Sequence, residues 1–184
     1  MAETINEVKF SDAAMAEIQR YISHYPEGRQ KSAILPILHI AQAEFGGWVS
    51  PEAMDRVAEI LNIQPIEVYE VATFYTMFNL KPVGKHVLEV CRTGPCCLRG
   101  ADQVIDMLKQ KLNIEEGGTT ADGMFTLKPV ECLASCGTGP MLQVREKYYE
   151  NLDTEERVDQ FLEMMRNSEV ETPFHQRPEA KELN

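Results

Sequence analysis

The clearest signal in this sequence is the stretch Cys91-Arg92-Thr93-Gly94-Pro95-Cys96, which is matched further along by Cys132-Leu133-Ala134-Ser135-Cys136. Four of the five cysteines therefore lie in two tight pairs, and each pair stands at the end of an apolar run. A [2Fe–2S] cluster needs four thiolates that converge on two irons, and two short cysteine loops from distant segments can supply them. The spacing favours an iron–sulfur site.

Two other uses of these cysteines stay open from the spacing alone. Tetrahedral zinc is also bound by four cysteines in two pairs, and these intervals are only slightly unusual for zinc. Unliganded or redox-active thiols are the remaining possibility, although a thioredoxin-type pair with two intervening residues is absent. Disulfides belong to oxidising compartments, and the first residues show no signal-peptide pattern, so disulfide pairs are not expected.

Composition indicates a soluble, cytoplasmic protein. The chain has 184 residues, of which 43% are hydrophobic and 26% charged, enough for one ordinary domain or two small ones. The net charge of −11 disfavours nucleic acid, whose phosphates would be repelled, although it can steer a basic partner. The longest apolar stretch, residues 33–41, is too short to cross a bilayer. We expect no nucleic-acid partner and no insertion into a membrane.

Residues 1–80 are predicted to be an N-terminal helical region. Ser11 and the pair Ser50-Pro51 are typical of helix N-termini, and Pro36 fits a helix only within its first turn. Apolar residues recur at helical spacing in four segments. These begin near residues 11, 32, 51 and 65, and short loops between them suggest a small bundle.

Residues 81–167 are predicted to form an α/β domain. Residues 86–90 alternate like a strand that leads into Cys91, and residues 124–130 form a strand that leads into Cys132. Open α/β sheets tend to bind ligands at the carboxyl ends of their strands, where both cysteine loops emerge. The other expected elements are a helix near 98–112, a hairpin around 145–147, a closing helix from Asp153 with Glu156 in a capping box, and an extended tail over 168–184.

Several separated motifs also resemble one known family. They include residues 91–100 and 130–136, together with residues 45–49, 71–75, 119–123 and 139–141. All are similar to the thioredoxin-like [2Fe–2S] ferredoxin subunit of NADH:quinone oxidoreductase, respiratory complex I. Related chains occur in NAD-reducing hydrogenases and NAD-dependent formate dehydrogenases. The resemblance spans roughly residues 11–166.

The resemblance implies both an architecture and a site. The expected fold is α/β, with a small N-terminal helical bundle followed by a thioredoxin-like [2Fe–2S] ferredoxin domain. The family's ligand pattern falls on Cys91, Cys96, Cys132 and Cys136, whereas Cys97 is out of register. One [2Fe–2S] cluster is expected in this chain, and FMN and NADH are expected on a neighbouring flavoprotein subunit.

The resemblance further implies an electron-transfer role in an NADH dehydrogenase (quinone). The complex would have its peripheral arm at the cytoplasmic side of the inner membrane. No glycine-rich phosphate loop occurs in the sequence, so the chain alone is not expected to oxidise NADH. The alternatives are a diaphorase-module subunit of an NAD-linked hydrogenase or formate dehydrogenase, and a zinc-stabilised interaction module.

Other residues near the cysteines carry separate expectations. Arg92 and Arg99 flank the first loop, where they either offset the negative charge of a thiolate-bound cluster or pair with surface carboxylates. Gly94, Gly137 and Gly139 are expected to let the backbone pass close to the cluster.

Overall fold

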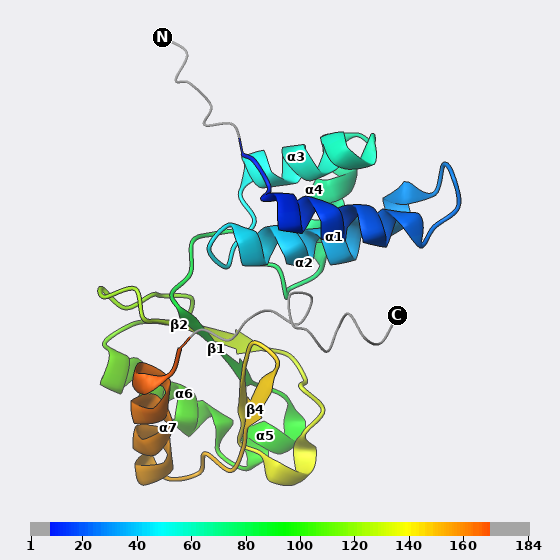
Figure 1. Cartoon of the computed structure of the whole chain (residues 1–184). Coiled ribbons are helices and arrows are strands. Elements are labelled where there is room, and N and C mark those ends of the chain that lie inside the picture. The colour runs from blue at the N-terminus through cyan, green and yellow to red at the C-terminus, as the bar shows by residue number, and fades with distance from the viewer. Residues whose placement is uncertain (1–7, 170–184) are drawn as a thin grey trace. The chain divides into compact units, whose positions relative to one another are not determined.

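The computed structural model describes residues 8–169, which group into two compact units that divide between Pro82 and Val83 (Figure 1). Each unit has its own cluster of buried apolar side chains. No helix in the described range is long and apolar enough to cross a bilayer. The extended tail predicted for residues 168–184 lies almost entirely outside this range and stays a prediction.

The first unit is the predicted helical bundle. Ser11 and Ser50 cap two of its helices, because their hydroxyls accept hydrogen bonds from the backbone N–H groups of Ala14 (3.2 Å) and Ala53 (3.1 Å). Pro36 lies in the first turn of its helix, where no intrahelical donor is needed. The helices in this unit are α1 (Asp12–Ser23), α2 (Ile34–Glu44), α3 (Pro51–Leu61) and α4 (Pro65–Phe74), with a 3₁₀ turn at Gln30–Ala33.

The second unit is built on a mixed sheet. Within residues 83–169 the sheet has four strands in the order β2-β1-β3-β4. These are β1 (His86–Cys91), β2 (Phe125–Val130), β3 (Leu142–Val144) and β4 (Lys147–Tyr149). β1 and β2 are parallel, while β3 is antiparallel to both β1 and β4.

The register of the parallel pair positions the cysteine loops. His86 lies opposite Phe125, and Cys91 lies opposite Val130. Parallel strands end at the same edge of a sheet. Cys91 and the segment that leads to Cys132 therefore leave the sheet side by side, which confirms the predicted α/β architecture and brings the two loops to one place.

The helices of this unit differ from prediction in two details. The helix expected near residues 98–112 is interrupted at Gly100, whose φ of +101° favours glycine, and α5 (Gly94–Leu98) precedes α6 (Ala101–Leu112). The closing helix α7 (Glu155–Asn167) does not begin at Asp153. Thr154 caps it instead, accepting a hydrogen bond from the backbone N–H of Arg157, while Asp153 pairs with the Arg157 side chain.

One apolar core joins the sheet to α6 and α7, which pack against each other (Figure 1). Leu88 and Leu127 from the parallel strands, Leu108 from α6 and Val158 from α7 are fully buried in it. Outside the core, the Lys111 ammonium links the two helices through carboxylates of α7 at 2.8 Å. This core holds the strand ends that carry the cysteine loops.

His86 is a buried polar group at the start of β1. Its side chain is 3% exposed, its ring lies 5.8 Å from that of Phe125, and Nε2 has no hydrogen-bond partner among the described residues. Burial lowers the pKa of His86 below its ordinary value, and the charges of Lys85 and Arg145 act in the same direction.

We expect His86 to make the second unit less stable in acid. Because its folded pKa lies below its unfolded pKa of about 6.5, the stability it contributes is present above that pH and is lost as the pH falls. Each unit of pKa depression is equivalent to about 1.4 kcal/mol. Denaturant unfolding at pH 8 and pH 5 should show a larger acid loss in the wild type than in His86→Gln. An identical loss in both proteins would contradict this role.

Candidate metal centre

The first cysteine pair is the buried half of the site. Cys91 ends β1 and Cys96 lies in α5, and their side chains are 3% and 2% exposed. The backbone oxygen of Thr93 accepts a hydrogen bond from the N–H of Cys96 at 2.9 Å, and Pro95 occupies the first turn of α5. This tight turn folds the chain back on itself, so the Cys96 thiol donates a hydrogen bond to the Cys91 sulfur.

The second cysteine pair is the exposed half. Both Cys132 and Cys136 are exposed, and Cys136 opens a short 3₁₀ turn, Cys136–Thr138. Between the two cysteines, Ala134 has a φ of +61°, and its backbone N–H donates to the Cys132 sulfur at 3.3 Å. This hydrogen bond ties the Cys132 sulfur to the backbone of its own loop.

The two loops are in direct contact. A backbone hydrogen bond joins Leu133 of the second loop to the Cys91 thiol. Arg99 Nη1 donates to the backbone oxygen of Gly137 at 3.1 Å. At Gly139, which precedes Pro140 through a cis peptide bond, an added Cβ would lie only 2.9 Å from the Cys96 sulfur. The structure thus brings all four predicted cysteines to one site.

The thiols influence one another electrostatically. Burial raises the pKa of Cys96 to about 11, and the hydrogen bond to Cys91 and the charges of Cys91, Cys136 and Cys132 act in the same direction. Burial also raises the pKa of Cys91, but hydrogen bonds from Thr93 and Leu133 outweigh it, so that this pKa is lowered. Thiolates crowded in this way repel each other, and bound cations would remove the repulsion.

The arrangement of the four cysteines as a buried pair and an exposed pair fits a [2Fe–2S] cluster. A [2Fe–2S] cluster bound by four cysteines requires only two thiolates at each iron, which a buried pair and an exposed pair can provide.

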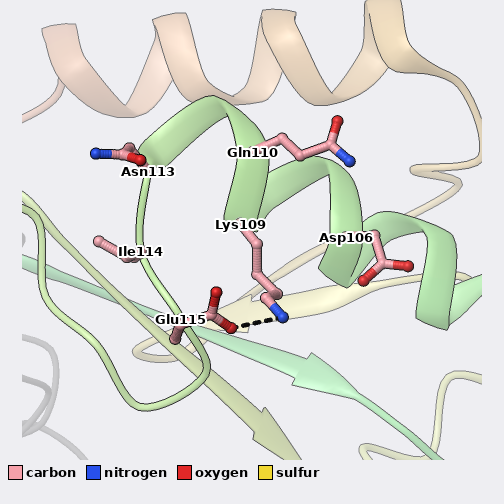
Figure 2. A pocket seen from close by; sticks show the side chains of 6 residues that line it. All are labelled: Asp106, Lys109, Gln110, Asn113, Ile114 and Glu115. Carbon is pink, nitrogen blue, oxygen red and sulfur yellow. Dashed lines mark ion pairs between the residues drawn. The ribbon is translucent and has the colours of Figure 1, made fainter.

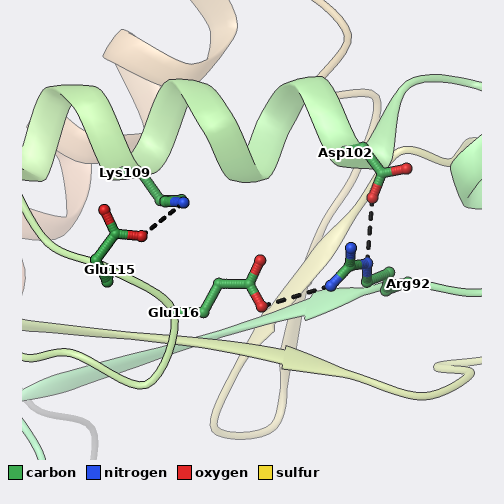
Figure 3. A network of polar contacts seen from close by, with 5 residues as sticks. All are labelled: Arg92, Asp102, Lys109, Glu115 and Glu116. Carbon is green, nitrogen blue, oxygen red and sulfur yellow. Dashed lines mark hydrogen bonds and ion pairs between the residues drawn. The ribbon is translucent and has the colours of Figure 1, made fainter.

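The arginines and glycines that flank the cysteines differ in their contacts with the site. Arg92 forms ion pairs with Asp102 at 3.2 Å and Glu116 at 3.4 Å (Figure 3), so its charge is paired with surface carboxylates. Arg99 instead reaches the second cysteine loop. Only Gly139 is in close contact with the site: at Gly94 and Gly137 a Cβ would meet nothing within 4 Å.

Sequence reasoning missed the polar side chains that shape the loops. The Thr93 hydroxyl lies 3.3 Å from the Cys91 sulfur, and a threonine directly before Gly94-Pro95 is a helix-start signal that could have indicated it. The Glu150 carboxylate accepts hydrogen bonds from Ser135 and Thr138. No local pattern indicates the role of Glu150, because it directly follows a separate hairpin, β3–β4.

A polar cavity of about 550 Å³ lies at the carboxyl end of α6 (Figure 2). Lys109 within it is paired with Glu115 at 2.6 Å. None of its lining residues is a cysteine, and its single cation is already matched by a carboxylate. The lining residues are Asp106, Lys109, Gln110, Asn113, Ile114 and Glu115. This cavity is therefore not part of the candidate site.

The mixed sheet and the paired cysteine loops define a thioredoxin-like α/β protein with a candidate thiolate metal site. The family of thioredoxin-like [2Fe–2S] ferredoxins matches residues 18–166 of the chain. The match covers most of the sequence and includes both cysteine pairs, and the chain belongs to this family.

Individual relatives support the same assignment. A subunit of the NADH-quinone oxidoreductase of Rickettsia bellii (strain RML369-C) is 41% identical over 167 residues, which is 91% of this chain and 99% of the relative. The mitochondrial NADH dehydrogenase [ubiquinone] flavoprotein 2 of Dictyostelium discoideum is 40% identical over 159 residues, or 86% of this chain and 64% of that protein.

A solved structure shares the fold. The NAD⁺-reducing [NiFe]-hydrogenase in the H₂-reduced state contains a chain that matches with a TM-score of 0.62 and 20% identity. The match covers 79% of this chain but only 24% of the hydrogenase chain. At this identity the likeness concerns the fold alone.

The close approach at Gly139 gives a direct test of the site's packing. We expect Gly139→Ala to lower the free energy of unfolding by about 1–3 kcal/mol, as overpacking typically does, and to lower the iron content per chain. Its new methyl group would press on the Cys96 sulfur. The matched control is Gly137→Ala, where a Cβ meets nothing within 4 Å. Equal iron content and unfolding curves in both variants would show that the close contact has no effect on the site.

Proposed function

We propose that the chain is an electron-transfer subunit of an NADH-oxidising complex of the NADH:quinone oxidoreductase type, with Cys91, Cys96, Cys132 and Cys136 as the ligands of one [2Fe–2S] cluster. The observation that carries this proposal is the meeting of the two cysteine loops at the carboxyl ends of β1 and β2. The relatives named as oxidoreductase subunits support it, because one of them is matched over nearly its whole length.

The protein's own groups would bind and tune the cluster. A bound cluster supplies one-electron redox chemistry. Burial of Cys91 and Cys96 keeps water from one side of the site, and the Ala134 N–H donates a hydrogen bond to the Cys132 sulfur. Hydrogen bonds to sulfur and solvent exposure are both known to set reduction potentials. The exposed pair would then be the side on which electrons enter or leave.

The proposed partner is a flavoprotein subunit that binds FMN and NADH. NADH gives up a two-electron hydride, whereas the cluster takes one electron at a time, so a flavin must stand between them. The acidic chain offers no glycine-rich phosphate loop for the dinucleotide. Within such a complex the chain would lie in the peripheral arm at the cytoplasmic side of the inner membrane, without inserting into the bilayer or binding nucleic acid.

A second candidate is the equivalent subunit in the diaphorase module of an NAD-linked hydrogenase or formate dehydrogenase. The fold that the chain shares with part of an NAD⁺-reducing hydrogenase is compatible with this candidate. The higher identity to NADH-quinone oxidoreductase subunits favours the first candidate. A zinc-stabilised module is separated from both by a visible absorption spectrum, since a [2Fe–2S] protein is coloured and a zinc protein is not.

Single cysteine substitutions test the ligand set. Replacing Cys91, Cys96, Cys132 or Cys136 by Ala should abolish the cluster or reduce its occupancy severely, because each thiolate would bind an iron directly. Cys97→Ala is the matched control, since Cys97 is adjacent to Cys96 but only half-buried in α5. Iron analysis and EPR after reduction would report the outcome. A cluster that survives Cys96→Ala but not Cys97→Ala would show that Cys97, and not Cys96, is the ligand.

Reconstitution with the partner subunit tests which of the two subunits oxidises NADH. The isolated chain should be reduced by dithionite but should not oxidise NADH with an artificial acceptor, because it lacks a flavin. Addition of the FMN-containing partner should produce NADH-dependent reduction of the cluster, measured by absorbance and EPR. NADH turnover by the flavin-free chain would refute the proposal.

A further inference from the structure

The second cysteine loop, residues 132–136, has a backbone conformation that contacts with other segments must stabilise. Ala134 is in the left-handed region, with a φ of +61°, which is unfavourable for a residue other than glycine. Both Cys132 and Cys136 are exposed, so burial in the core does not hold them. Strained backbone persists only where the surrounding structure fixes it. The contacts of this loop therefore show what keeps its two cysteines in place.

The Glu150 carboxylate joins two points of the loop. Its Oε1 atom accepts hydrogen bonds from the hydroxyls of Ser135 and Thr138, which also lie 2.8 Å from each other. Ser135 directly precedes Cys136, and Thr138 ends the 3₁₀ turn that Cys136 opens. One oxygen atom thus holds both sides of the turn that contains Cys136. These two hydrogen bonds also hold the pKa of Glu150 below its ordinary value, so that it is charged at neutral pH.

Neighbours of Glu150 hold the rest of the loop. The Tyr148 hydroxyl donates to the backbone oxygen of Leu133 at 2.7 Å, one residue after Cys132. The Asn151 N–H donates to the backbone oxygen of Thr138 at 2.8 Å. All three supporting residues belong to β4 or to the segment directly after it. The end of the hairpin thus follows the cysteine loop along most of its length.

We propose that Glu150 is a positioning residue for the cluster, and that, together with Tyr148, it fixes the second cysteine loop in the conformation that presents Cys132 and Cys136. This inference rests on the proposed function for the identity of the bound group. Glu150 acts through Ser135 and Thr138 and touches no cysteine itself. Its charge also lies beside the loop that carries two thiolates, where it disfavours the reduced, more negative cluster.

The test compares Glu150→Ala and Glu150→Gln with Glu163→Gln in the full-length, cluster-loaded chain. Glu163 is an exposed carboxylate on α7 and serves as the matched charge control. Hydrogen bonds to charged groups are among the stronger ones in proteins, so Glu150→Ala should release iron to a chelator about tenfold faster or more. Glu150→Gln keeps an acceptor oxygen and should release iron more slowly than Glu150→Ala. Because Glu150→Gln removes the charge beside the loop, its cluster should have a more positive reduction potential than the cluster of Glu163→Gln.

A double-mutant cycle shows whether Glu150 acts through the two hydroxyls. In the background of Ser135→Ala and Thr138→Val, which removes both donors, Glu150→Ala should accelerate iron release much less than it does in the wild type. The effects of residues that act through each other are not additive. Tyr148→Phe, which removes only one hydroxyl, should accelerate release on its own. Hydrogen exchange of the peptide spanning residues 131–139 should rise in Glu150→Ala, in the apo chain as well.

The outcomes separate this proposal from the proposed function. A wild-type chain without the absorption of a [2Fe–2S] cluster would refute the function, while faster exchange of the loop in apo Glu150→Ala would still support the positioning role. A wild-type chain with a cluster whose release rate, potential and loop exchange are unchanged by Glu150→Ala would overturn the positioning role alone. Strict additivity in the double-mutant cycle would also overturn it.

Discussion

The parallel, in-register pairing of β1 with β2 is the constraint on which the site depends. Because Cys91 lies opposite Val130, the two strands end together, and the loops that follow them have to meet. The shared core of the sheet, α6 and α7 fixes this register, since a shift by one residue would turn Leu88 and Leu127 away from the helices. The apolar core of the sheet and the two helices thus determines where the cysteines converge.

The convergence of four cysteines places thiols that can become negatively charged close together, and the two pairs lie in different surroundings. The first pair is buried, and burial together with neighbouring thiols raises the pKa of Cys96. The second pair is exposed and depends on polar contacts from another hairpin. Cation binding relieves the repulsion among thiolates at both pairs. A bound positive group would therefore stabilise the thiolate form of the site, which is consistent with membership of an iron–sulfur family.

The sequence indicated those features that depend on local chemistry. Ser11 and Ser50 predicted helix starts correctly, and the alternation before Cys91 predicted β1, because caps and strand periodicity act over a few residues. The break at Gly100 was missed, since a glycine between two helical stretches is also tolerated inside one helix. The support from Glu150 could not be predicted, because it depends on how the hairpin packs beside the cysteine loop.

The asymmetry between the two pairs follows from how each is held. Backbone geometry fixes the first pair: Cys96 is placed by the turn after Thr93, and Gly139 leaves room beside its sulfur. The second pair depends in addition on side chains, through hydroxyls and a carboxylate that solvent can reach. Solvent-reachable hydrogen bonds open more readily than buried backbone ones. The exposed pair, Cys132 and Cys136, is thus more accessible to a partner, and the hydrogen bonds that hold it open more readily. A partner that covers this pair would shield those hydrogen bonds from solvent.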